Sequence, residues 1–530
     1  MTFCASKPKS WLGAILALGG VVRLVAFVWN TRLFGDVNLY ALVARQWTET
    51  GRLDYPGKFD YFDPAPYLTL ATPVSQHPPA WSWLAGMLTS IHLAPDEFTA
   101  LKILCLVFGL TVIALGMSIA RALAGSRAAL ITGLALALHP MLVDYSANGS
   151  PYIAVAAGAL AAAYAALATE RPAWMRGALA GAGAAAAWNF HGVGMLLVPA
   201  GLIALALNVP RERRTQSLGG FLGASAILLL PLFIWNHANF GKLLQSTSTF
   251  YVQGKLGLMH LTQEAGIIHY QIGELGWQHL APYTFLALKS SLLFFLHLGS
   301  ESGFAGLVLA GVACFTLRKK IPRARMAGVA LVVLAIAVPC LGWPEFKYRF
   351  LVPTLPFVVV LAVIGLEELR GLRWPQWIPR MLAAGAIISC AVFWIVQISI
   401  TGSPAKYYAY DLRHLRDYHL MREAADFLRD QPPGVVLAFS DYLDGGSEAV
   451  WWHGKPNVEA RGFPDALVRK LAADFKPSYL LLSPQRRDLA ASLCQGAQPC
   501  FENKEYLVYK PSGNALQQNS RISPQAVFLK

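Results

Sequence analysis

The sequence predicts a polytopic α-helical membrane protein that carries a small α/β domain after its last membrane span. Of the 530 residues, 55% are apolar and only 14% are charged, whereas about 25% of the residues in a soluble domain are charged. The mean hydropathy is +0.44, and apolar runs near the bilayer-crossing length of about 20 residues recur along the chain. These runs stop near residue 400, and short strand-like and helix-like segments follow.

The same composition excludes several classes of protein. So few charged residues argue against a soluble enzyme and against a disordered chain. Seven cysteines in 530 residues are too sparse for a disulfide-rich secreted scaffold. The sequence contains no P-loop, no glycine-rich dinucleotide motif after a strand and no HExxH metal motif.

Eleven apolar runs are candidate spans, although several are short or are interrupted by Gly or Pro. The first has no small-residue cleavage site, so it is interpreted as an anchor rather than a cleaved signal. The runs are Trp11–Trp29, Phe98–Ala120, Ala128–Tyr145, Pro151–Ala168, Gly177–Trp188, Val193–Leu207, Leu218–Trp235, Phe304–Leu317, Met326–Leu341, Phe350–Leu366 and Met381–Ile400.

Two further apolar stretches, Pro79–Leu93 and Ala281–Leu298, fit either a short span or a surface helix. If both cross the membrane, the chain has 13 spans, and Arg121 and Arg127 face the opposite side from the cluster 318–325. If both lie along the surface, the basic connectors share one side, as the positive-inside rule requires. We therefore predict about eleven spans, a cytoplasmic N-terminus and an external C-terminus, in the inner membrane of a bacterium.

The net charge of +14 follows this topology. Residues 401–530 hold 16 Lys and Arg against 14 Asp and Glu, so nearly all of the excess lies in the hydrophobic part. There the basic residues occupy short connectors and are not interleaved with aromatic residues in one block. A nucleic-acid partner is therefore not expected.

The predicted topology also separates connectors from functional loops. The long segments 30–78 and 237–282, the short turns near Asn148 and His191, and the turn 343–349 all fall on the outer side. Long loops on a rigid scaffold are where binding and catalytic residues concentrate.

Three of these outer segments contain residues suited to chemistry. Asp36 follows the first span, and Tyr40 would share its helix face, although Asp36 could equally cap that helix. His77 precedes Pro78-Pro79 at a helix start, where an anion is favoured, but a structural role is also common for such a histidine. Arg349 opens a span from the outside, where it can hold a phosphate or extend to lipid head groups.

These motifs resemble GT-C glycosyltransferases, in the branch of the protein O-mannosyltransferases and the lipid A aminoarabinose transferases. The resemblance covers roughly residues 10–400, and four segments carry it in the same order and on the same predicted side. They are the loop that begins at Asp36-Val-Asn-Leu-Tyr40, His77-Pro-Pro with its following aromatic residues, Asp144-Tyr-Ser-Ala-Asn-Gly-Ser-Pro-Tyr152, and Tyr348-Arg-Phe-Leu-Val-Pro-Thr-Leu-Pro356.

The resemblance implies transfer of a hexose or pentose from a polyprenyl-phosphate donor at the outer membrane face. The acceptor would be a lipid, a protein or a polysaccharide. Asp36 would be the general base. Arg349, with His77 and Lys347, would hold the donor phosphate, whose negative charge grows in the transition state. Further candidate substrate contacts are Tyr40, Asp144 and Tyr152.

Two departures from the family pattern argue against a metal requirement. Many relatives have a second acid directly after the first, but Val37 stands there in this chain. Some relatives have an Asp in the second outer loop, where Ser150 is the matching residue. Because a second carboxylate would help to hold a divalent ion, a divalent metal is an alternative that this pattern does not favour, and no other cofactor is expected.

The alternative function is a non-enzymatic lipid or polysaccharide transporter or flippase. Such a protein should show inverted repeats and charged pairs within its spans, but no clear repeat is present and most charges lie in loops. Arg23 is the exception. An intramembrane charge is a functional candidate by default, although a hydrogen bond between helices would also explain it.

Residues 401–511 are predicted to form the small α/β domain on the outer face, and 512–530 a polar tail. Helices are expected at Leu412–Leu428 and Ala466–Phe475, and strands at Val435–Phe439, Tyr479–Leu482 and Tyr506–Tyr509. Cys494 and Cys500 are six residues apart, so an oxidising compartment would permit a disulfide.

Overall fold

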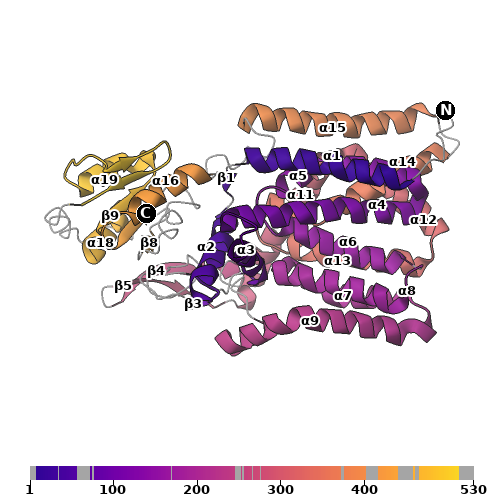
Figure 1. Ribbon diagram of the computed structural model, residues 1–530, viewed down its shortest axis with the longest axis horizontal. Helices are drawn as coiled ribbons and strands as arrows, with labels where there is room; N and C mark the ends of the chain where they lie inside the picture. The colour runs from indigo at the N-terminus through magenta and orange to yellow at the C-terminus, as the bar shows by residue number, and fades with distance from the viewer. Residues whose placement is uncertain are drawn as a thin grey trace.

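The computed structural model is a bundle of helices with a small sheet domain at one end (Figure 1). In Figure 1 the bundle helices run side by side, and the N-terminus lies at the end opposite the sheet domain. The structure describes residues 8–30, 32–33, 35–55, 72–73, 77–168, 170–244, 252–253, 256–264, 267–274, 276–371, 375–401, 416–439, 457–459 and 465–511. The predicted polar tail 512–530 and the start of the helix expected from Leu412 lie outside these residues.

Each of the eleven predicted spans coincides with a helix, which confirms the fold class. The corresponding helices are α1 (Pro8–Trp29), α4 (Glu97–Leu138), α6 (Tyr152–Leu167), α7 (Ala173–Phe190), α8 (Leu197–Asn208), α9 (Arg214–Phe240), α12 (Phe304–Lys320), α13 (Arg323–Leu341), α14 (Leu355–Gly371) and α15 (Trp377–Thr401). The helix α4 contains one span before Gly125, where the backbone turns, and most of the next, Ala128–Tyr145, which ends in the helix Pro140–Tyr145. Gly125 has φ +86°, which glycine adopts without the steric cost that a side chain would add.

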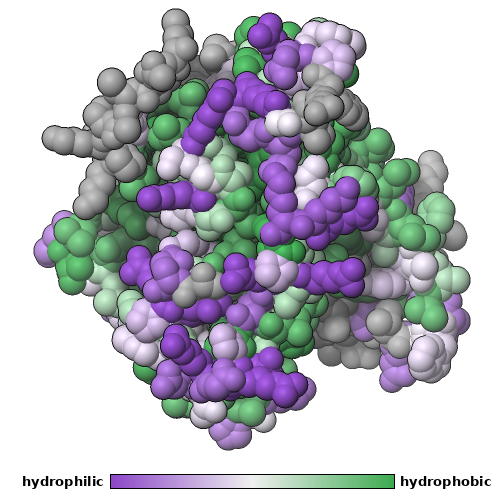
Figure 2. Space-filling model, turned by 90° about the vertical axis from the view of Figure 1, so that its right-hand side faces the viewer, coloured by the Kyte–Doolittle hydropathy of each residue, from purple (hydrophilic) through white to green (hydrophobic). Residues whose placement is uncertain are grey.

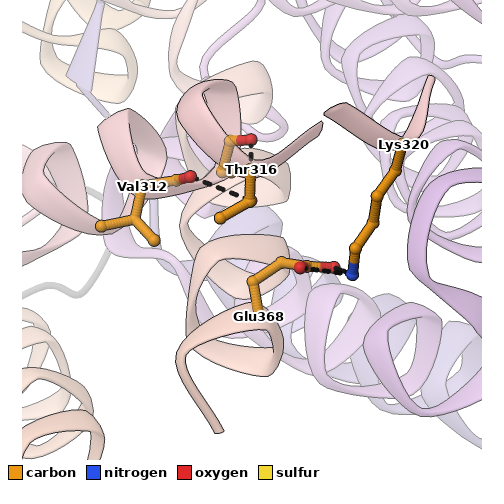
Figure 3. Close-up of polar contacts among 5 residues, drawn as sticks. Val312, Thr316, Lys320 and Glu368 are labelled. Carbon is orange, nitrogen blue, oxygen red and sulfur yellow. Dashed lines mark hydrogen bonds and ion pairs between the residues drawn. The ribbon is translucent and has the colours of Figure 1, made fainter. Parts of the chain in front are cut away.

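Two ion pairs place two of the basic turns at one end of the bundle. Arg127, after the turn in α4, lies 3.5 Å from Glu367 of α14. Lys320, at the end of α12, lies 2.6 Å from Glu368, which follows Glu367 on α14 (Figure 3). Figure 2 shows hydrophilic side chains gathered across this end of the molecule, which we call the basic end. The opposite end, where the sheet domain lies, is the site end.

These pairs decide between the two topologies. The helix α3 (Ala80–Ser90) has 11 residues, about 16 Å, and is too short to cross a bilayer core of about 30 Å. The helix α11 (Leu280–Glu301) is long and apolar enough to span. However, a crossing by α11 would place Lys320 and Arg127 at opposite ends of the bundle, whereas both pair with α14.

The contacts of α11 show how it is placed instead. The hydroxyl groups of Tyr283 and Ser291 donate to the carbonyls of Gly342 (2.7 Å) and Leu341 (2.8 Å). Both acceptors lie at the C-terminal end of α13, so α11 crosses that end rather than running beside α13. These contacts support a count of about eleven spans with α3 and α11 outside it. By length and composition alone, five of the described helices could cross a membrane, and α11 is one of them.

Arg23 is accounted for by hydrogen bonds between helices. Its fully buried guanidinium donates to the carbonyls of Leu136 (3.1 Å) and Ala137 (3.0 Å) and to the hydroxyl of Ser146 (3.0 Å). The last carbonyls of a helix have no partner within that helix. Arg23 therefore caps the end of α4 and ties it to α1.

The C-terminal domain is built on a five-stranded sheet with the order β10-β11-β9-β7-β8. The three predicted strands are present as β7 (Val436–Phe439), β9 (Tyr479–Leu482) and β11 (Leu507–Tyr509). The strand β7 pairs in parallel with β8 and β9, and β11 pairs antiparallel with β9 and β10. The edge strands β8 (Asn457–Glu459) and β10 (Phe501–Glu502) were not predicted, because two or three residues carry no readable alternation.

Helices α16 (Tyr418–Arg429), α18 (Asp465–Phe475) and α19 (Arg487–Leu493) complete this domain. The disulfide that the sequence permits is not formed, since Cys494 and Cys500 are free thiols.

The domain contacts the bundle beside the first loop. Strand β6 (Arg416–Asp417) pairs antiparallel with β1 (Arg32–Leu33), directly before α2 (Gly35–Thr50). On α16, Arg422 lies 3.2 Å from Asp96, the N-cap of α4. Other described elements at the site end include α5 (Pro140–Tyr145), the strand pairs β2 (Asp54–Tyr55) with β3 (Thr72–Pro73) and β4 (Met259–Glu264) with β5 (Ile267–Ile272), and the 3-10 turn η4 (Tyr348–Leu351).

Candidate active site

An ion pair between Asp36 and Arg349 lies at the site end of the bundle. Asp36 is the second residue of α2, and Arg349 lies in η4, on the turn between α13 and α14. The distance between Asp36 Oδ2 and Arg349 Nη1 is 2.6 Å. The side chains keep 23% and 27% of their exposure, so the pair is largely enclosed yet reachable.

A chain of rings extends from this pair. Tyr40, one turn along α2, has its ring centroid 5.3 Å from that of His77, which lies 5.2 Å from His191. The ring of His191 lies 4.5 Å from Tyr152, the first residue of α6, and the Arg349 guanidinium lies 5.8 Å from the Tyr152 ring. Five segments that are far apart in the sequence therefore surround one small volume.

The electrostatics of Asp36 reflect two opposing effects. Burial alone would raise the pKa of its carboxyl, because it disfavours the charged form. Arg349, with smaller contributions from His77 and Lys347, outweighs burial, so the pKa of Asp36 lies below its ordinary value. Asp36 is therefore ionised at neutral pH.

His191 was missed as a site residue. Its Nδ1 accepts a hydrogen bond from the backbone N–H of Val193 at 3.2 Å. Burial first, then the positive charges of His77 and Arg349, hold its pKa well below the ordinary value. The ring is therefore neutral and carries its proton on Nε2. The available signal was topological, since the sequence placed His191 in an outer turn.

Two buried donors in the site have no hydrogen-bond partner among the residues that the structure describes. One is Nε2 of His191, and the other is Nε of Arg349. A buried donor without a partner costs free energy, and most such groups in native proteins are paired. Both donors belong to residues in contact with Tyr152, so they serve the same volume.

The remaining predicted site residues are placed differently. Lys347 forms an ion pair with Glu345 at 3.1 Å, although its charge still contributes to lowering the pKa of Asp36. Asp144 is fully buried in α5, so a substrate reaches its carboxylate only if the surrounding helices move. Within the described residues, no three His, Cys, Asp or Glu side chains are grouped to hold a metal ion.

The fold and the site define a polytopic membrane protein with an enclosed acid–arginine pair at one end of its bundle. In sequence, residues 76–235 match the family model of dolichyl-phosphate-mannose-protein mannosyltransferases. The match includes His77, Tyr152 and His191 but neither Asp36 nor Arg349. No curated protein sequence matches the chain.

Solved structures of GT-C glycosyltransferases are similar over nearly the whole chain. The archaeal oligosaccharyltransferase AglB from Archaeoglobus fulgidus, in complex with an inhibitory peptide and a dolichol-phosphate, is 14% identical with a TM-score of 0.56, over 91% of this chain and 71% of AglB. ArnT from Cupriavidus metallidurans bound to undecaprenyl phosphate is 16% identical with a TM-score of 0.53, over 94% of this chain and 98% of ArnT. The arabinofuranosyltransferase AftD from Mycobacteria is 14% identical with a TM-score of 0.54, over 95% of this chain and 41% of AftD.

These comparisons confirm the resemblance that the sequence motifs indicated. The protein has the GT-C fold. In sequence and fold it resembles the protein mannosyltransferases and ArnT.

Proposed function

We propose that the protein is an integral-membrane glycosyltransferase that moves a sugar from a polyprenyl-phosphate-linked donor to an acceptor. The fold supports this proposal, because AglB and ArnT share it and were solved with dolichol-phosphate and undecaprenyl phosphate respectively. The observation that carries the proposal is the pair of buried, unpartnered donors, Arg349 Nε and His191 Nε2, beside an ionised carboxylate.

Arg349 and His191 would form the centre of the phosphate site. Their free N–H groups match the oxygens of a phosphate, which accept hydrogen bonds and donate none. In a largely enclosed site, donors fixed where charge grows stabilise the departing lipid phosphate. His77 and Lys347 add positive potential, although Glu345 offsets part of the charge of Lys347.

Asp36 would take the proton from the acceptor hydroxyl or amine as the new glycosidic bond forms. In the resting protein its Oδ2 is held by Arg349. An incoming donor phosphate competes for the same guanidinium and loosens that contact. The pKa of Asp36 then rises toward its ordinary value, and the carboxylate becomes a stronger base when a donor is present.

The proposed orientation puts the site end outside the cell and the basic end in the cytoplasm. Two of the basic turns lie at one end of the bundle, and Lys and Arg are enriched on the cytoplasmic side of membrane proteins. The C-terminal domain would then lie in the periplasm of a bacterium, beside the site.

The test is the substitution Asp36→Asn in a deletion strain complemented with the gene. Glycolipids and glycoproteins are compared by mass spectrometry, and Asp430→Asn serves as an exposed control. We expect a product that is lost in the deletion, restored by wild type and Asp430→Asn, and absent with Asp36→Asn at equal membrane abundance. A transporter does not need this base, so full product with Asp36→Asn would overturn the proposal.

A further inference from the structure

A pocket lies away from the ion pair, where α2 and α3 end. It has a volume of about 700 Å³ and is open on one side. Its lining combines hydroxyl groups, an imidazole and an apolar surface, contributed by Thr48, Thr89, Ser90, His92, Leu93, Ala94 and Pro95. Nothing in the proposed transfer chemistry uses these residues.

Each hydroxyl group of the pocket already donates its proton in a hydrogen bond to a backbone carbonyl of its own helix. Thr48 donates to the carbonyl of Ala44 at 2.8 Å, Thr89 to that of Ala85 at 3.1 Å, and Ser90 to that of Gly86 at 2.9 Å. A hydroxyl has one proton and two lone pairs. These three oxygens can therefore only accept hydrogen bonds from a ligand.

The charges next to the pocket also oppose an anionic ligand. Glu49 follows Thr48 and is paired with Arg45, and Asp96 follows Pro95 and is paired with Arg422. Glu97, one residue further along, is buried at 7% exposure. A phosphate would meet carboxylates here and no hydroxyl proton.

We infer that this pocket binds the neutral, hydroxyl-bearing carbohydrate part of the acceptor. Sugar hydroxyls supply the donors that the three oxygens lack, and Leu93, Ala94 and Pro95 offer an apolar surface for a ring face. This inference rests on the proposed function. Thr48 and Asp36 are twelve residues apart on α2, about 18 Å at 1.5 Å per residue. The occupant is therefore an extended oligosaccharide rather than a single sugar.

The experiment uses photo-crosslinking in intact cells. Leu93, which lines the pocket and is 64% exposed, is replaced by p-benzoylphenylalanine in the full-length protein. Ile91 is 58% exposed but outside the lining, so the same replacement there is the matched control. After irradiation, adducts are oxidised with periodate and labelled with a hydrazide, which marks the vicinal diols of a glycan.

We expect a labelled adduct from position 93 that is several-fold stronger than that from position 91. In a Thr48→Val, Thr89→Val, Ser90→Ala background the signal should fall roughly tenfold or more, since each lost hydrogen bond weakens binding severalfold. Equal labelling from both positions, a signal that persists in the triple variant, or phospholipid adducts alone would overturn the inference.

Repeating the capture in the Asp36→Asn background separates the two proposals. Binding in the pocket does not require turnover, so the adduct should persist while product is lost. An adduct together with full product would overturn the transfer mechanism and leave the pocket standing. Loss of product without any adduct would overturn the pocket alone.

Discussion

The two ends of α2 and α3 offer opposite chemistry. At their N-terminal ends lie Asp36 and His77, next to the unpartnered donors of Arg349 and His191. At their C-terminal ends lies a pocket whose hydroxyl oxygens can only accept hydrogen bonds. One end is therefore suited to an anion and the other to a neutral hydroxyl-bearing ligand.

The helix dipoles support the same division. The N-terminal end of a helix carries partial positive charge and favours anions, and the C-terminal end carries partial negative charge. Because α2 and α3 both begin at the ion pair and both end at the pocket, their dipoles alone favour a phosphate at one end and a neutral sugar at the other. If this comparison is right, substitutions at one end should leave binding at the other end unchanged.

The largest effect is expected from Arg349→Ala. It removes both the partner of Asp36 and one of the free donors, so affinity for undecaprenyl phosphate should fall by about 10- to 100-fold, the range for hydrogen bonds to charged groups. Native mass spectrometry of the full-length protein in nanodiscs would measure this loss. Arg349→Lys should recover only part of the affinity, because it restores the charge but not the fork of donors.

Labelling through position 93 provides the control for Arg349→Ala and should not change. If the variant bound undecaprenyl phosphate as wild type does, or lost labelling at position 93, the division between the two ends would be wrong.

The same variant should shift the pH dependence of transfer. With Arg349 present, the pKa of Asp36 lies below its ordinary value of about 3.9, so the base is ionised throughout the physiological range. Burial raises the pKa of Asp36, and without Arg349 less positive charge counteracts this effect. The pKa of Asp36 therefore rises in the variant. The acid limb of the kcat/KM profile should therefore move to higher pH in Arg349→Ala, and an unchanged limb would exclude Asp36 as the titrating base.

The sequence predicted the bundle well, because span length and connector charge are local properties. Each of the eleven apolar runs became helical, and the kink at Gly125 separates the two runs that α4 covers. Whether α11 crosses the membrane could not be decided locally, since its length and composition permit a span. The pairs of Arg127 and Lys320 with neighbouring acids of α14 decided it, and these are contacts between distant segments.

The site was predictable in its members but not in its geometry. Topology placed Asp36, His77 and Arg349 on one side, yet nothing in the sequence indicates that Asp36 and Arg349 touch across 313 residues. His191 was missed because its role depends on the hydrogen bond that fixes its tautomer and on the ring of Tyr152. The hydrogen bond is local to the turn after α7, whereas the contact with Tyr152 arises only when α6 and α7 pack together.

A smaller effect is expected from His191→Phe. Phenylalanine keeps an aromatic ring against Tyr152 but removes the Nε2 proton, so undecaprenyl phosphate should bind about 3- to 10-fold more weakly, as for one lost hydrogen bond. His419→Phe, at an exposed position in the C-terminal domain, is the control. Unchanged phosphate affinity in His191→Phe would remove this histidine from the phosphate site.

The smallest effect is expected at Lys347, and it tests how far the positive end extends. Lys347 is ion-paired with Glu345 at 3.1 Å, and its side chain is 36% exposed, so solvent and the partner carboxylate both screen its charge. Lys347→Ala should therefore weaken undecaprenyl phosphate binding by no more than about threefold at physiological salt. Glu345→Gln releases the lysine and should strengthen binding by a similar factor, more so at low ionic strength. If Lys347→Ala instead matched Arg349→Ala, the lysine would contact the phosphate directly, and the anion site would be centred on the whole 345–349 turn rather than on Arg349 and His191.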